Sequence, residues 1–206
     1  MLLFDKEKDG VRYAVWHVTE TYEELATLMT DGHKILAQAK SQFKSESRIK
    51  EWVAVRVLLH SMLGSNGHIA YLSNGAPHLV GTHDEISISH TKGYVCIALS
   101  NKKKVGIDIE RLSNKVERVK SHFIGEDEPC ECSLVKMHLI WSAKEAIYKL
   151  LQINGLNFKK DIRVKDFTES SHGTFTTYHK EQAYETNYIV SPDYVMTLIA
   201  KSHTTS

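Results

Sequence analysis

Apolar residues recur along this chain with two different periods, and each period predicts its own kind of element. Helical spacing runs through residues 21–40 and again through residues 47–64. Thr21 and Glu24 have the spacing of a capping box at the first helix, and Gly64 is a stop signal after the second. The chain is therefore expected to place its first helices before residue 65.

From residue 69 the apolar positions recur every second residue, which is the period of strands. Residues 69–81 resemble a hairpin around Asn74-Gly75, and residues 84–90 alternate through Ile86 and Ile88. The next strand is apolar on both faces, as in the centre of a sheet. The remaining predicted elements are that central strand 94–100, a strand at 104–110, a helix at 133–151 and strands within 161–167, 173–180 and 187–201.

This order of helices, strands, helix and strands predicts an α+β fold with two lobes. The boundary is expected near "SNKKK", which gives an N-terminal lobe at residues 1–102 and a C-terminal lobe at residues 103–206. The later strands would close a second sheet, and a cleft would separate the lobes.

Composition and charge exclude several classes of function. A net charge of +1 gives no global attraction to nucleic acid or to a membrane surface. The N-terminus lacks the apolar run of a signal peptide, and three cysteines without such a peptide indicate a reducing cytoplasm. A zinc site from His122, Cys130, Cys132 and His138 is disfavoured against a solvated acidic loop, because C-x-C lacks the usual two-residue spacing.

The stretch "VGIDIE" places two acids on one side of a predicted strand. Side chains alternate in a strand, so Gly106, Asp108 and Glu110 share a face opposite the apolar residues. The two acids would lie roughly 6–7 Å apart at their Cα atoms. Such a pair is costly in a partly dry cleft unless a cation neutralises it. A simple polar strand face remains the alternative.

The helix at 133–151 carries a second polar stripe. Its core side is expected to hold the aliphatic residues, and Trp141, Ser142, Glu145 and Lys149 fall on the opposite side. Taken alone, Glu145 and Lys149 are better explained as an ordinary surface ion pair four residues apart. Ser89 and His90, at the end of "SISH", add a third polar group, although a lone histidine there is more often structural.

The combination of "SISH", "GIDIE" and "WSAKEAIYK", in this order, resembles the 4′-phosphopantetheinyl transferases. The resemblance covers most of the chain, and its core runs from "NGAPHL" to "WSAKEAIYKLL". The length is similar to the two-lobed monomeric branch typified by the surfactin-synthetase activator. The resemblance implies two similar α/β lobes related by a pseudo-twofold axis, with the active site between them.

Members of this family move phosphopantetheine from coenzyme A to a carrier-protein serine and release 3′,5′-ADP. The resemblance implies a requirement for Mg²⁺, with Mn²⁺ as a possible substitute, held by Asp108, Glu110 and Glu145. Mg²⁺ prefers such hard oxygen ligands. Glu145 is expected to accept the serine proton, and Lys149 to stabilise the leaving phosphate. The further phosphate contacts implied by the resemblance are His90, Ser89 and Lys144.

The same resemblance implies a site for the rest of coenzyme A. Arg48 matches a basic position that pairs with the 3′-phosphate, with Lys44 assisting. Gly75, Ala76 and Pro77 match a turn that lies along the adenine. Ala76 departs from the family, which often has lysine there. Arg56 also matches a family arginine, although a role on the helix surface or between the lobes is an equal alternative.

The expected partner is an apo acyl or peptidyl carrier protein of fatty-acid, polyketide or nonribosomal peptide biosynthesis, and the expected state is a cytoplasmic monomer. The basic segment with Arg111, Lys115, Arg118 and Lys120 could dock its acidic surface. Two other functions stay open, namely a non-catalytic coenzyme A binder and a metal-dependent nucleotide pyrophosphohydrolase. No P-loop or G-x-S-x-G pattern is present to suggest a kinase or an esterase.

Overall fold

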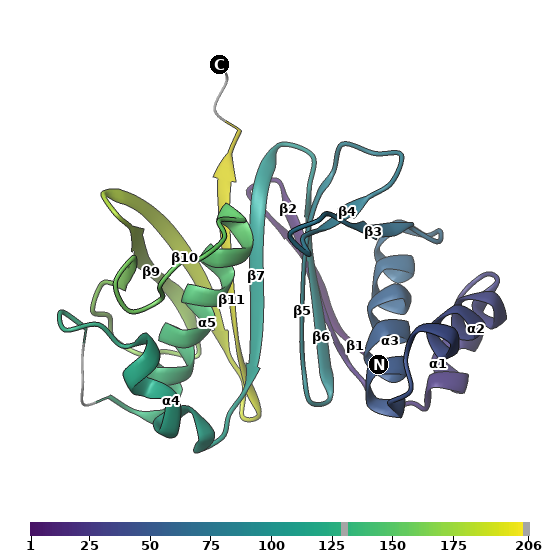
Figure 1. The fold of residues 1–206 in the computed structure, drawn as a ribbon, viewed down its shortest axis with the longest axis horizontal. Coiled ribbons are helices and arrows are strands. Elements are labelled where there is room, and N and C mark those ends of the chain that lie inside the picture. The colour runs from purple at the N-terminus through teal and green to yellow at the C-terminus, as the bar shows by residue number, and fades with distance from the viewer. Residues whose placement is uncertain (129–131, 204–206) are drawn as a thin grey trace.

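The computed structural model describes residues 1–128 and 132–203, and these form four layers (Figure 1). Two antiparallel sheets occupy the middle, with one group of helices outside each of them. The first sheet contains, in order, β1 (Leu2–Lys8), β2 (Val11–His17), β6 (Tyr94–Ser100) and β5 (Glu85–Thr91). The second contains β7 (Lys103–Arg111), β11 (Tyr194–Ser202), β10 (Gln182–Val190), β9 (His172–His179) and β8 (Ile162–Val164). The predicted α+β class is confirmed.

The N-terminal hairpin of β1 and β2 was not expected from the apolar pattern. Most of β1 is exposed, so its residues alternate only weakly. Its turn is made by Asp9 and Gly10, both with positive φ (51° and 76°), the conformation typical of a tight hairpin turn. The Asp-Gly pair was therefore a usable sequence signal.

Three helices cover the outer face of the first sheet: α1 (Tyr22–Thr27), α2 (Gly32–Gln42) and α3 (Glu46–Leu63). The capping box of Thr21 and Glu24 is present, and Gly64 ends α3 in the left-handed conformation, as predicted. The helix expected over residues 21–40 is broken into two. The break lies at residues 28–31, where Asp31 has a positive φ of 55°. Gly32 then begins α2, and a Cβ there would approach the carbonyl oxygen of Ala26 to 1.7 Å.

The predicted strands after α3 are present. A two-stranded hairpin, β3 (Ile69–Tyr71) and β4 (Pro77–Leu79), contains Asn74 and Gly75 in its loop. Every residue of β6 is buried, and this strand lies inside its sheet, as its apolar sequence predicted. In the C-terminal half, α5 (Leu134–Leu151) packs on the second sheet with α4 (Lys115–Phe123) beside it. The short helix α4 was not predicted.

A hydrophobic core between the two sheets joins the halves of the molecule. Val105, Ile107 and Ile109 of β7 pack there against residues of β2 and β6, such as Val15 and Cys96. The apolar side of β7 thus faces the first sheet, which leaves its acids facing α5. Within the described residues, no helix is long and apolar enough to cross a membrane. The division at residue 102 and the pseudo-twofold axis remain predictions.

Candidate active site

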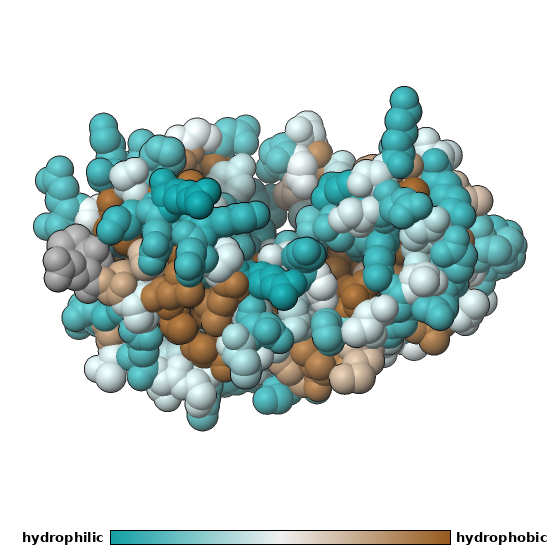
Figure 2. All heavy atoms as spheres, turned by 90° about the horizontal axis from the view of Figure 1, so that it is seen from below, coloured by the Kyte–Doolittle hydropathy of each residue, from teal (hydrophilic) through white to brown (hydrophobic). Residues whose placement is uncertain are grey.

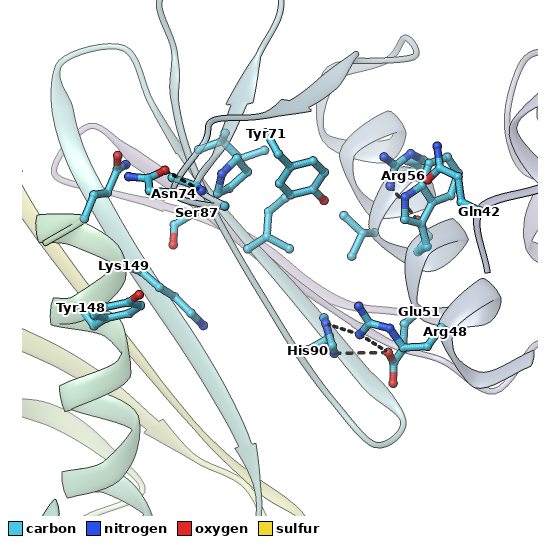
Figure 3. Close-up of a pocket in the computed structure, with 18 of the residues that line it drawn as sticks. Gln42, Arg48, Glu51, Arg56, Tyr71, Asn74, Ser87, His90, Tyr148 and Lys149 are labelled. Atoms are coloured by element: carbon cyan, nitrogen blue, oxygen red, sulfur yellow. Dashed lines mark hydrogen bonds and ion pairs between the residues drawn. The ribbon is translucent and has the colours of Figure 1, made fainter. Parts of the chain in front are cut away.

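A pocket of about 510 Å³ lies between the two halves, with α3, β5 and the β3–β4 loop on one side and the end of α5 on the other (Figure 3). Its predicted members are brought together: Arg48, Gly75, Ala76, Pro77, His90 and Lys149 line it. Lys44 is exposed and is not among the lining residues. Its lining residues run from Gln42 to Asn154 in the sequence, so both halves of the chain contribute to it.

Arg48, His90 and Glu51 meet at one end of the pocket, where Nη1 of Arg48 lies 3.4 Å from Nε2 of His90 (Figure 3). Oε2 of Glu51 accepts a hydrogen bond from Nη1 of Arg48 at 3.1 Å and lies 3.6 Å from Nδ1 of His90. Burial lowers the pKa of His90, and the cations Arg48 and Lys149 lower it further against the opposing effect of Glu51. Sequence reasoning missed Glu51, because a pair three residues apart on a helix resembles an ordinary surface pair.

Arg56 lines the middle of the same pocket. Its guanidinium lies over the Trp52 ring, 3.1 Å from the centroid, and donates to the Trp52 carbonyl oxygen at 3.0 Å. Burial lowers its pKa to about 10, although Tyr71 opposes the shift. Arg56 therefore contributes positive charge to the pocket wall between the halves, and its role as a family arginine stays a prediction.

The β3–β4 loop supplies the turn at the other side of the pocket. Gly75 has a φ of +83°, a conformation that favours glycine, and the backbone N–H of Ala76 donates to Oδ1 of Asn74 at 3.0 Å. This bond fixes the backbone of the loop where it borders the pocket. The small side chain of Ala76 brings no charge to that edge.

Gly106 explains why the acids of β7 lie against α5. A Cβ on Gly106 would come within 2.0 Å of the Ala146 carbonyl oxygen, so only glycine allows the helix to approach this strand so closely. Asp108 and Glu110 share the face of Gly106, as the alternation predicted. Strand and helix together therefore place Asp108 next to Lys149.

Asp108 is 3% exposed and is held by two donors on a single oxygen. Its Oδ1 accepts from Nζ of Lys149 at 2.7 Å and from Oγ of Ser89 at 2.8 Å. Its other oxygen, Oδ2, is buried and has no hydrogen-bond partner among the described residues. The ion pair of Lys149 is therefore with Asp108 rather than with Glu145, its alternative partner four residues away.

Glu110 and Glu145 complete the acidic cluster. Burial, together with the charge of Asp108, raises the pKa of each carboxyl to about 7. Nε1 of Trp141 donates to Oε1 of Glu110 at 2.8 Å and fixes that side chain. Lys149 responds in the opposite sense: burial lowers its pKa, but the charge and hydrogen bond of Asp108 outweigh this and raise it overall. Lys149 therefore stays charged.

The negative charges of this cluster suit a divalent cation, but the present arrangement of its side chains does not form a metal site. The unpartnered Oδ2 of Asp108 and the two carboxyls of raised pKa all mark a deficit of positive charge. Yet no three His, Cys, Asp or Glu side chains within residues 1–128 and 132–203 are arranged to hold a metal ion. A metal would have to draw at least one of these carboxylates inward.

Two residues of α5 lie elsewhere than expected. Lys144 is completely buried, and its Nζ contacts Glu128 and three backbone carbonyl oxygens, so a role in contacting a coenzyme A phosphate is wrong for this structure. Ser142 is also fully buried and contacts Thr197 of β11, so it belongs to the core side. Glu128 was missed, because an acid in a loop gives no signal that it will be buried.

Ser89 and His90 point to opposite faces of β5, since neighbours in a strand alternate. His90 faces α3 and Glu51, whereas Ser89 faces β7 and Asp108. Among the residues of the disfavoured zinc site, Cys130 lies outside the described residues. His138 is buried, and its ring nitrogens contact the backbone of Ser113 and Leu134.

Comparison with known proteins gives a consistent match. Residues 104–199 match the family model of the 4′-phosphopantetheinyl transferase superfamily. Over 125 residues the chain is 32% identical to "4′-phosphopantetheinyl transferase AcpT" of Salmonella typhi, which covers 56% of this chain and 63% of that protein. Over the same length it is 31% identical to the protein of that name from Salmonella typhimurium strain LT2. The match thus spans less than two thirds of these relatives.

Proposed function

We propose that the protein transfers 4′-phosphopantetheine from coenzyme A to a serine of an apo carrier protein, because residues 104–199 match the family model of the 4′-phosphopantetheinyl transferase superfamily. The observation that carries the proposal is the position of Lys149. This residue lines the pocket between the halves and also donates to Asp108 of the acidic cluster. The pocket, whose cations suit a polyanion, and the acidic cluster of Asp108, Glu110 and Glu145 therefore meet at the side chain of Lys149.

The pocket residues would bind and orient coenzyme A. Arg48, Arg56 and His90 offer positive charge or N–H donors along the wall from α3 and β5. A guanidinium binds phosphate through paired hydrogen bonds, which suits Arg48 to the 3′-phosphate. The 75–77 turn would lie along the adenine. Lys149, at the junction, would face the pyrophosphate and stabilise the negative charge of the departing 3′,5′-ADP.

Asp108, Glu110 and Glu145 would hold Mg²⁺ once at least one side chain moves inward. When bound, the ion supplies charge stabilisation at the pyrophosphate. It would also satisfy Oδ2 of Asp108.

Glu145 is the proposed proton acceptor. Burial and Asp108 raise the pKa of Glu145 to about 7 in the metal-free protein. Bound Mg²⁺ would lower this pKa, which keeps the carboxylate ionised and able to accept a proton. As the serine oxygen forms its bond to the β-phosphorus, its proton moves to the carboxylate of Glu145. The bond between that phosphorus and the bridging oxygen breaks, and 3′,5′-ADP leaves with the electron pair.

The carrier protein would approach from the side of α4. A hollow of about 400 Å³ there is lined by Glu110 and Trp141 of the acidic site and by Val119 and Lys115 of α4. Figure 2 shows this face of the molecule, where hydrophobic residues in the left half are framed by hydrophilic ones. An acidic carrier surface would meet Arg111, Lys115, Arg118 and Lys120 while its serine enters beside Glu110.

Incubation of the protein with coenzyme A, Mg²⁺ and an apo carrier protein tests this function. A mass gain of one phosphopantetheine on the carrier is the expected result. Release of that group into solution instead would indicate a pyrophosphohydrolase, and tight coenzyme A binding with neither product would indicate a binding protein. Either of these outcomes would overturn the proposal.

A further inference from the structure

Three hydroxyl side chains on one face of β5 connect the two sheets. Ser87, Ser89 and Thr91 alternate along β5, and each contacts β7, the nearest strand of the other sheet. Oγ of Ser87 accepts from the backbone N–H of Ile107 at 3.0 Å, and Oγ1 of Thr91 accepts from the N–H of Arg111 at 3.3 Å. These two hydroxyls accept hydrogen bonds from backbone N–H groups on the edge of β7 that does not pair with β11. They take the place of the backbone hydrogen bonds that a neighbouring strand would make there.

Ser89 differs from the other two hydroxyls because its partner is a carboxylate rather than the backbone. Its Oγ donates to Oδ1 of Asp108 at 2.8 Å, and Ser89 is itself only 7% exposed. Lys149 donates to the same oxygen at 2.7 Å. Two donors on Oδ1 fix the rotation of the carboxylate, with the result that Oδ2 is the oxygen left without a partner.

We propose that Ser89 is a positioning residue that orients Asp108 across the boundary between the two halves, so that Oδ2 faces the metal. The inference rests on the proposed function, and it departs from the expectation that Ser89 contacts a phosphate. Ser89 does not line the pocket, whereas Ser87 and His90 do. Second-sphere hydrogen bonds of this kind fix metal ligands, and their loss typically lowers metal affinity.

The test compares Ser89→Ala with Thr91→Val, which is a matched control. Both variants lose one hydroxyl from the same face of the same strand, but only Ser89 contacts Asp108, and Thr91 does not line the pocket. Mn²⁺ binding in the presence of coenzyme A is measured by electron paramagnetic resonance, and thermal unfolding checks that both variants fold. Coenzyme A binding without metal is measured by calorimetry.

Ser89→Ala is expected to weaken Mn²⁺ binding by about tenfold or more, while Thr91→Val keeps the wild-type affinity. Ser89→Thr, which retains the hydroxyl, is expected to restore binding. Coenzyme A affinity without metal should be the same in all four proteins. Equal Mn²⁺ affinity in Ser89→Ala and Thr91→Val would overturn the proposal, and so would a loss of metal-free coenzyme A binding confined to Ser89→Ala.

The wild-type protein separates this inference from the proposed function. A wild type that modifies the carrier, with a Ser89→Ala variant that keeps its Mn²⁺ affinity, contradicts only the role of Ser89. A wild type that neither binds Mn²⁺ nor modifies the carrier contradicts both.

Discussion

At the scale of single residues, Glu145 is the most direct test of the chemistry. Glu145→Gln keeps the shape of the side chain but cannot accept the serine proton. Transfer is expected to fall by about 10²–10⁴-fold, with coenzyme A binding largely retained. The measurement is the initial rate of carrier modification, followed by mass. The matched control is Glu46→Gln, at the exposed start of α3, and full activity in Glu145→Gln would exclude Glu145 as the base.

The carboxyl of Glu145 should also make the free energy of unfolding depend on pH. Burial and Asp108 raise the pKa of Glu145 from 4.5 to about 7 in the folded protein. The folded state therefore holds a proton that the unfolded chain releases, so this stabilisation is complete below pH 4.5 and lost as the pH rises through 7.

Glu145→Gln removes that dependence. The variant is expected to be more stable than the metal-free wild type at pH 8, with a difference that shrinks toward pH 5. Thermal unfolding of both proteins across this pH range measures the effect. Added Mg²⁺ should raise the melting temperature of the wild type at pH 8 more than that of the variant. A constant difference at all pH values would show that the pKa of Glu145 is not raised.

At the scale of elements, Gly106 sets the distance between β7 and α5. Gly106→Ala puts a Cβ 2.0 Å from the Ala146 carbonyl oxygen, so helix and strand must separate. Overpacking of this kind costs about 1–3 kcal/mol or more, and the shift also moves Lys149 away from Asp108. Gly173→Ala, in β9 of the same sheet, is the control, because its Cβ meets only side-chain atoms of Tyr188, at 3.1–3.2 Å, and no backbone. Denaturant unfolding should show a far larger loss for Gly106→Ala.

A buried ion pair holds the loops around α5 in place. Lys144 and Glu128 contact each other at 2.6 Å, and Glu128 also accepts from the backbone N–H groups of Gly125 and Val164. Glu128→Ala leaves a buried ammonium group without its counterion, which costs about 3–5 kcal/mol. Thermal unfolding should detect this, whereas coenzyme A affinity of the folded variant should be unchanged. A selective loss of coenzyme A affinity would restore Lys144 as a phosphate contact.

The sequence predicted those elements in which period and burial agree, and it missed those in which they do not. The alternation in β7 correctly separated Asp108 from Ile107, because one face meets a helix and the other meets a sheet. The exposed strand β1 and the short helix α4 bury too few side chains to leave a clear period. Ser142 was misplaced because a hydroxyl can enter a core when it finds a partner, here Thr197.

The site follows the same rule. The family resemblance implied that Asp108, Glu110 and Glu145 act together, and in the structure Asp108 raises the pKa of both Glu110 and Glu145. Partners that come from distant parts of the chain, such as Glu51 for His90 and Glu128 for Lys144, depend on tertiary packing. No local pattern carries that information.

At the scale of the whole molecule, a near-neutral protein must attract an acidic partner through a local patch. The charge is +1 overall, so the basic residues around α4 would have to provide the steering. The double variant Arg118→Glu and Lys120→Glu is expected to lower kcat/KM for the carrier by about tenfold at low salt. The defect should shrink as salt screens the charges, and coenzyme A affinity should stay the same.

The control must change the net charge equally at a distant place. Lys102 and Lys104 are exposed at the opposite end of β7 from α4, so Lys102→Glu with Lys104→Glu provides it. If the patch around α4 guides the carrier, the control pair keeps nearly the wild-type kcat/KM at every salt concentration. Equal defects in both pairs would mean that net charge alone governs the encounter. If neither pair shows a defect, the carrier protein binds at another surface, and the hollow beside Glu110 is not its docking site.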